Sequence, residues 1–129
     1  MKKRGIALSA AMLIILGAGT AHAGDAVLFT PMLSPPVGGE LVCNVTNIGK
    51  KDLAEATVSL YHASGGGSTV CNDLNTVQEF ANGHTCSFAT TLASVCMVTI
   101  TGGSHKSVRA VLNVVDSSGA TILSVPATR

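Results

Sequence analysis

The chain has 129 residues, of which 47% are hydrophobic and 12% are charged, and its formal net charge is +1. A chain of this length is too short for two independent cores, so we expect a single folded domain. The sequence has no long basic run, which argues against nucleic acid as a partner.

The N-terminus has the three parts of a secretory signal peptide. A basic start (Met1–Arg4) precedes the apolar stretch 6–18, and an Ala-x-Ala site ends at Ala23 before Gly24. The apolar stretch is too short to span a bilayer, which needs about 20 apolar residues. We therefore expect cleavage between Ala23 and Gly24, and a mature chain, residues 24–129, that has no membrane span and is secreted or periplasmic. Cleavage would remove three of the eight Lys and Arg residues, leaving five against seven acidic residues, a net charge of −2.

Beyond the signal peptide, short alternating segments are separated by turn residues. In one segment Leu41, Cys43 and Val45 fall on one face, the period-two pattern of a strand with one buried side. The segment Ala63–Asn75 contains three consecutive glycines, and we expect it to be an irregular loop carrying Cys71. Short strands without a helical period predict an all-β sandwich. The expected strands are Asp25–Thr30, Glu40–Asn47, Ala56–Tyr61, Thr76–Phe80, Thr85–Leu92, Val95–Thr101, Val108–Val115 and Thr121–Val125.

All four cysteines follow the cleavage site, and an even number in a short exported chain indicates a disulfide framework. Cys43 and Cys96 lie in mid-strand with apolar residues two positions away, so we expect them to pair across the sheets. Cys71 and Cys86 lie in or beside predicted loops, and their bond would fasten the segment between them. The alternative bond between Cys86 and Cys96 would need a hairpin around Ala93, whose register would keep the two sulfur atoms apart.

Three segments also carry a resemblance to known proteins: LVCNVTNIGKKDLAEATVSLYHASG, VCNDLNTVQEFANGHTCSF and VCMVTITGGSHKSVRAVLNVVDSSGA. They resemble small secreted bacterial β-sandwich proteins of unassigned function, whose outline is immunoglobulin-like. The resemblance covers about residues 40–125. It implies an immunoglobulin-like Greek-key sandwich of about seven to eight short strands with a cross-sheet disulfide, and it implies no activity.

The sequence offers few candidates for chemistry. His62, His84 and His105 are not spaced as metal ligands on a shared strand or helix, so we expect no metal site and no cofactor. The Ser104-His105 pair lacks the pattern that surrounds a catalytic serine, so we predict no catalytic residue.

The most distinctive charged cluster contains His105, Lys106 and Arg109, on what we expect to be one hairpin of a slightly acidic domain. These residues are weak binding candidates for an anionic partner, and the alternative is a solvated turn. We expect a monomeric, exported, non-enzymatic surface interaction or structural module, whose partner is an unknown protein or an envelope polymer. Two alternatives stay open: a small envelope enzyme or metal-binding protein that uses strand-end loops, and a subunit of a secreted surface assembly that donates Asp25–Thr30 as a strand.

Overall fold

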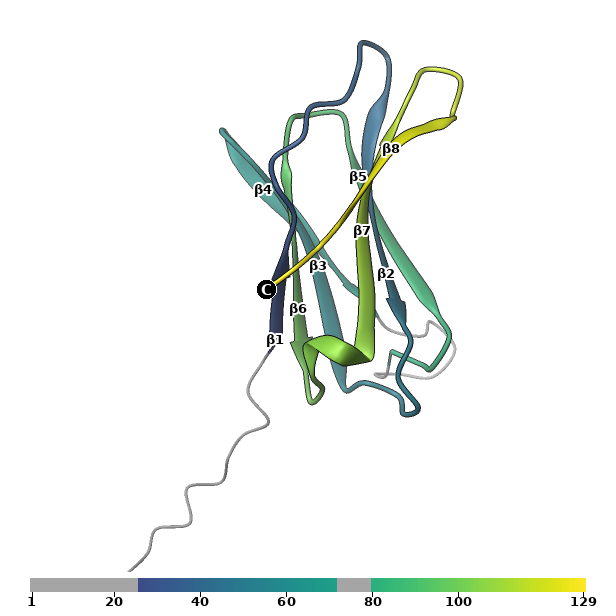
Figure 1. The fold of residues 1–129 in the computed structure, drawn as a ribbon. Coiled ribbons are helices and arrows are strands. Elements are labelled where there is room, and N and C mark those ends of the chain that lie inside the picture. The colour runs from purple at the N-terminus through teal and green to yellow at the C-terminus, as the bar shows by residue number, and fades with distance from the viewer. Residues whose placement is uncertain (1–25, 72–79) are drawn as a thin grey trace, which may run out of the picture.

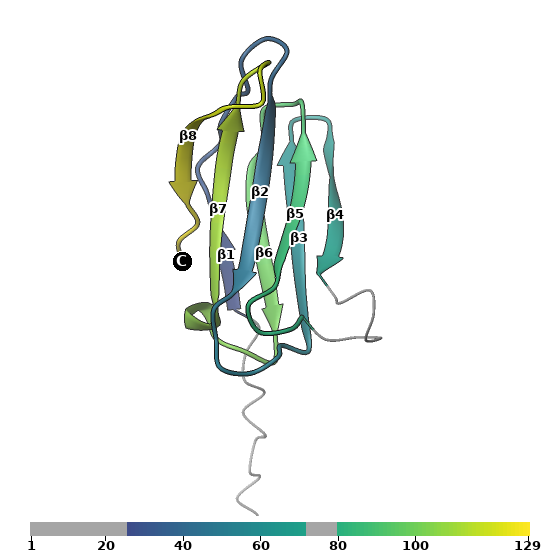
Figure 2. The same cartoon turned by 90° about the vertical axis from the view of Figure 1, so that its right-hand side faces the viewer.

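Two four-stranded antiparallel sheets packed face to face make up the part of the chain that the structure describes, residues 26–71 and 80–129 (Figure 1). The structure is a computed structural model. The first sheet has the strand order β1-β6-β3-β4 and the second has β5-β2-β7-β8, so the predicted all-β sandwich is confirmed. Figure 2 looks onto the second sheet. The strands are β1 (Ala26–Phe29), β2 (Glu40–Asn47), β3 (Glu55–His62), β4 (Gly65–Cys71), β5 (Thr85–Thr90), β6 (Val95–Thr101), β7 (Val108–Val115) and β8 (Thr121–Pro126).

The core is aliphatic and follows the period-two pattern of the sequence. Because successive side chains of a strand point to opposite faces, every second residue of β2, β6 and β7 is buried. Leu41, Val98 and Leu112 are fully buried between the sheets. No helix among the described residues is long and apolar enough to cross a membrane.

The connections between strands differ from the predicted hairpins. β6 lies in the first sheet and β7 in the second, so the segment between them crosses the sandwich through a short 3-10 helix, η1 (His105–Ser107). The cluster of His105, Lys106 and Arg109 is therefore on a sheet-crossing connection, and the hairpin prediction is wrong. The strands β3, β4 and β5 follow one another around the sandwich, and β6 returns beside β3, which is a Greek-key connection.

The glycine-rich segment forms an edge strand, so the predicted irregular loop is wrong. β4 pairs with β3 from Gly65 to Cys71. The glycines suit this position because a Cβ added at Gly67 would lie 3.1 Å from the ring of Phe88, which packs there. Cys71 is therefore a strand residue and not a loop residue, and Cys86 lies on β5, within the predicted strand Thr85–Leu92. Most of the predicted strand Thr76–Phe80 lies outside the described residues.

Both predicted disulfides are present, and each joins one sheet to the other. Cys43 on β2 is bonded to Cys96 on β6, and both side chains are fully buried. Cys71 on β4 is bonded to Cys86 on β5, at the side of the sandwich where these two edge strands meet.

The opposite side of the sandwich is closed by residues that follow β8. β8 pairs with β7 as far as Pro126, and the residues after it cross to β1, as Figure 1 shows near the C-terminus. There the backbone N–H of Phe29 donates to the carbonyl of Thr128 at 2.7 Å, and the N–H of Thr128 donates to the carbonyl of Phe29 at 2.8 Å. We call residues 127–129 the tail.

Candidate binding site

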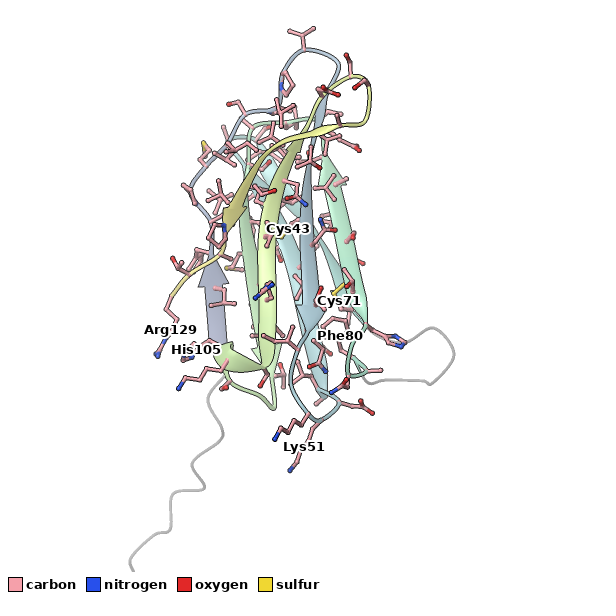
Figure 3. All side chains as sticks on the ribbon, turned by 45° about the vertical axis from the view of Figure 1, so that its right-hand side comes forward. Cys43, Lys51, Cys71, Phe80, His105 and Arg129 are labelled. Carbon is pink, nitrogen blue, oxygen red and sulfur yellow. A yellow bond between two sulfur atoms is a disulfide. The ribbon has the colours of Figure 1, made fainter. Side chains whose placement is uncertain are left out.

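Basic residues gather at one end of the sandwich. The antiparallel strands bring together the loop between β2 and β3, the segment containing η1, the start of β7 and the end of the tail (Figure 3). We call this the basic end. It carries all five Lys and Arg residues that follow the predicted cleavage site: Lys50, Lys51, Lys106, Arg109 and Arg129.

Among the described residues, the acidic side chains at this end are fewer than the basic ones. Of the described residues, Asp52 and Glu55 lie there, so five positive and two negative side chains give a net charge of +3. Glu40 and Asp116 lie at the opposite end, where β2 begins and β7 ends. The described residues therefore separate charge along the long axis of the sandwich.

Buried Asn47 holds the loop that carries Lys50 and Lys51. Its Nδ2 donates to the carbonyls of Lys51 and Phe80 at 3.0 and 2.9 Å, and its Oδ1 accepts from the N–H of Gly49 at 3.0 Å. An asparagine without solvent contact is stable only when its amide is hydrogen-bonded in this way. These bonds give the basic end a fixed backbone.

The same loop is fastened to η1. The carbonyl of Ser107 accepts from the N–H groups of Ile48 and Gly49 at 2.9 and 3.1 Å. Ser104 caps η1, because its Oγ accepts from the N–H of Lys106 at 3.3 Å. Ser104 therefore has a structural role, the capping of η1, in the Ser104-His105 pair.

A groove of about 410 Å³ opens between β1, the start of β7 and the tail. Its floor is apolar and is formed by Leu28, Val108, Ala110 and Ala127. Its rim carries His105, Arg109 and Arg129, and Figure 3 shows His105 and Arg129 side by side. None of the described residues that line it is acidic. We call it the cationic groove.

The structure brings together two of the three residues predicted as weak binding candidates. His105 and Arg109 line the cationic groove, whereas Lys106 is exposed on η1 and is not part of the lining. Arg129 was missed, because no local pattern announces that the tail returns to β1. The predicted cleavage site, Ala23 and Gly24, lies outside the described residues.

His62 and His105 lie at opposite ends of the sandwich. His62 ends β3 at the opposite end from η1, and its Nδ1 lies 3.0 Å from Oγ of Ser64. In residues 26–71 and 80–129, no three His, Cys, Asp or Glu side chains are grouped so that they could hold a metal ion.

A second groove of about 440 Å³ lies at the opposite end and differs in chemistry. Pro35, Pro36 and Leu92 contribute to its lining, which carries no charged side chain among the described residues. A third, smaller groove of about 290 Å³ lies beside Lys50 and Lys51. The cationic groove is thus the one that combines an apolar floor with several positive charges.

The negative charge at the opposite end is stabilised locally. The hydroxyl of Ser118 donates to Oδ1 of Asp116 at 2.6 Å, and the N–H groups of Ser118 and Ala120 donate to it at 2.8 and 3.0 Å. These bonds, the Ser118 hydroxyl first, lower the pKa of Asp116 below its ordinary value of 3.8. The charge separation along the sandwich therefore persists well below neutral pH.

Together these features define a small disulfide-bonded β-sandwich with a cationic groove at one end. No family model matches the sequence, and comparisons with curated proteins and with solved structures found no match.

Proposed function

We propose that the protein is an exported, non-enzymatic binding module that holds an anionic partner at its basic end. The observation that carries this proposal is the convergence of His105, Arg109 and Arg129 on one groove of a chain that is otherwise slightly acidic. Arginine suits this role because its planar guanidinium binds carboxylate and phosphate groups through paired hydrogen bonds.

Binding fits the groove better than catalysis does. The charged side chains on its rim all belong to basic residues, which favours attraction of one anionic group. General acid–base chemistry instead uses groups whose environments push their pKa values apart. The apolar floor formed by Leu28 and Val108 would contact the uncharged part of the same ligand.

The setting of this module is proposed to be the cell envelope or the medium around it. The signal-peptide pattern and two disulfides support export, because disulfides persist in oxidising compartments. Acidic polymers and proteins of the envelope would meet the basic end there. The two cross-sheet disulfides would keep the groove in shape outside the cell.

A matched pair of double variants tests the proposal. Arg109→Gln/Arg129→Gln removes two charges from the groove, and Val37→Glu/Ala63→Glu lowers the net charge equally on exposed loops at the opposite end. Binding to labelled alginate, polyphosphate and an acidic peptide is measured by fluorescence anisotropy. Two exposed charge contacts of up to about 1 kcal/mol each predict a loss of up to about thirtyfold for the groove variant only.

Salt provides the second readout. The screening length falls from about 10 Å at 0.1 M to about 3 Å at 1 M salt, so binding should weaken over this range. Equal losses in both double variants would mean that only the net charge matters. Failure of all three probes to bind the wild-type protein would refute the proposed function.

A further inference from the structure

The wall of the cationic groove contains a strand edge without a partner strand. β2 pairs with β7 over its whole length, from Val108 to Val115. β8 pairs with β7 only from Val111 onward. Next to the last paired residue, the tail contributes a single bond, from the N–H of Ala127 to the carbonyl of Ala110 at 2.9 Å. The beginning of β7 therefore has a neighbouring strand on one side only.

The direction of the backbone groups follows from this bond. In an antiparallel strand the N–H and C=O of one residue point to the same side, and the side alternates from residue to residue. Because the Ala110 carbonyl points to the tail, the N–H and C=O of Val108 point to that side too, and those of Arg109 point to β2. Val108 is extended, with φ −131° and ψ 152°, so the alternation holds there.

The facing wall repeats this arrangement. Phe29 on β1 exchanges both of its backbone hydrogen bonds with Thr128 of the tail. By the same alternation, the N–H and C=O of Val27 point away from β6 and toward the groove side. Below the tail, two strand edges thus border the groove, and each offers a peptide donor and acceptor.

We propose that the cationic groove binds an extended acidic peptide, which adds to β7 beside Val108 as a further strand. This inference rests on the proposed function and names its ligand class. Strand addition is a common way of binding peptides, in which main-chain hydrogen bonds give affinity and alternate side chains give specificity. The groove has both requirements, a free edge and two chemically different faces.

The pattern of the peptide follows from the two faces of β7. Val108 and Ala110 are buried on the inner face, whereas Arg109 is exposed on the outer face. Side chains of an added strand would alternate in the same way. The inner ones would contact Leu28 and Val108, and the outer ones would lie opposite Arg109, where an acidic residue forms a favourable cross-strand pair.

Charge complementarity alone does not distinguish a peptide from an acidic polysaccharide or polyphosphate. The free backbone edge does, because only another peptide presents N–H and C=O groups at the spacing of β7. A polysaccharide or polyphosphate would use Arg109, Arg129 and His105 and leave the peptide groups of Val108 and Val27 to water.

The test uses the peptide acetyl-Thr-Glu-Val-Glu-Val-Glu-Thr-amide and the ¹⁵N-labelled mature protein. Three control peptides are used: one replaces Glu by Lys, and two carry N-methyl groups on alternate residues, one in each of the two registers. We expect the Glu peptide to bind, and the Lys peptide and one N-methyl register to bind at least about tenfold more weakly. Hydrogen exchange should slow at the amide of Val108, on the free edge of β7, and stay unchanged at Arg109, whose N–H already faces β2.

Other outcomes separate the two proposals. Equal binding of the Glu peptide and both N-methyl registers, or unchanged exchange at Val108, would overturn strand addition. Binding of alginate or polyphosphate but not of the Glu peptide would overturn the peptide ligand and leave the anionic-partner function standing. Absence of binding by all of these probes would overturn both.

Discussion

The two disulfides should contribute unequally to stability, and the difference can be estimated from the structure. The bond between Cys43 and Cys96 closes a sequence separation of 53 residues, and that between Cys71 and Cys86 closes 15. In the loop-entropy model these separations correspond to about 4 and about 3 kcal/mol. The inner loop shortens the outer one to about 38 residues (53 − 15), which lowers the larger figure by only about 0.3 kcal/mol, because the cost is logarithmic.

Burial enlarges this difference. Cys43, Cys96 and Cys71 are buried, whereas Cys86 is half-buried at the side of the sandwich. Replacing a buried cysteine by alanine removes its sulfur atom and leaves a small cavity, which costs about 1 kcal/mol per buried sulfur. We therefore expect Cys43→Ala/Cys96→Ala to lose about 1.5 kcal/mol more than Cys71→Ala/Cys86→Ala.

Urea unfolding of the two double variants and the wild-type protein measures this difference. With a slope of roughly 2 kcal/mol per molar urea, the core variant should unfold at a urea concentration about 0.7 M lower than the edge variant. Fluorescence of Tyr61 and far-UV circular dichroism should report the same transition. A larger loss in the Cys71→Ala/Cys86→Ala variant would refute the assignment of the main structural role to the core bond.

Three further predictions concern the backbone, pH and processing. Gly39→Ala should lower the free energy of unfolding, measured in urea, by several kcal/mol, because the added Cβ would lie 2.2 Å from the carbonyl oxygen of Val115. Gly119→Ala is the control: its φ is +85° and the added Cβ would contact nothing, so it should cost only about 1–2 kcal/mol. The pKa of Asp116 is lower in the folded than in the unfolded chain, so its stabilising contribution is present above about pH 4 and disappears as the pH falls through the folded value. An NMR titration of its carboxyl carbon should therefore have a midpoint below 3.8, and a midpoint above it would contradict the three hydrogen bonds. N-terminal sequencing of protein from cells that export it should begin at Gly24, and a sequence beginning at Met1 would contradict the signal peptide.

Much of the fold could be predicted because burial follows side-chain alternation. β2, β6 and β7 have one apolar face each, and their bounds match the predicted ranges Glu40–Asn47, Val95–Thr101 and Val108–Val115. The pairing of Cys43 with Cys96 followed from their position on such faces. Alternation does not determine which sheet a strand joins, and this is why the predicted hairpin between β6 and β7 is wrong.

Two features could not be predicted because they depend on residues distant in the sequence. Gly65–Cys71 has no alternating apolar pattern, and it becomes a strand because β3 pairs with it and Phe88 packs on Gly67. The cationic groove needs Arg129 beside His105, and the backbone bonds of Ala127 to β7 and of Thr128 to β1 bring the tail there. The local sequence thus predicts His105 and Arg109 as candidates, whereas only the tertiary structure shows that Arg129 lies beside them.

The central claim is that partners bind at the basic end. The most direct measurement places a photo-crosslinking amino acid at Ile48, which is exposed on the rim of the cationic groove, or at Val37, which is exposed at the opposite end. Both proteins are irradiated in the cells that export them, with and without Arg109→Gln/Arg129→Gln. The account predicts an adduct from position 48 that disappears in the arginine variant, and none from position 37. An adduct from position 37 alone, or one from position 48 that persists without the two arginines, would contradict it.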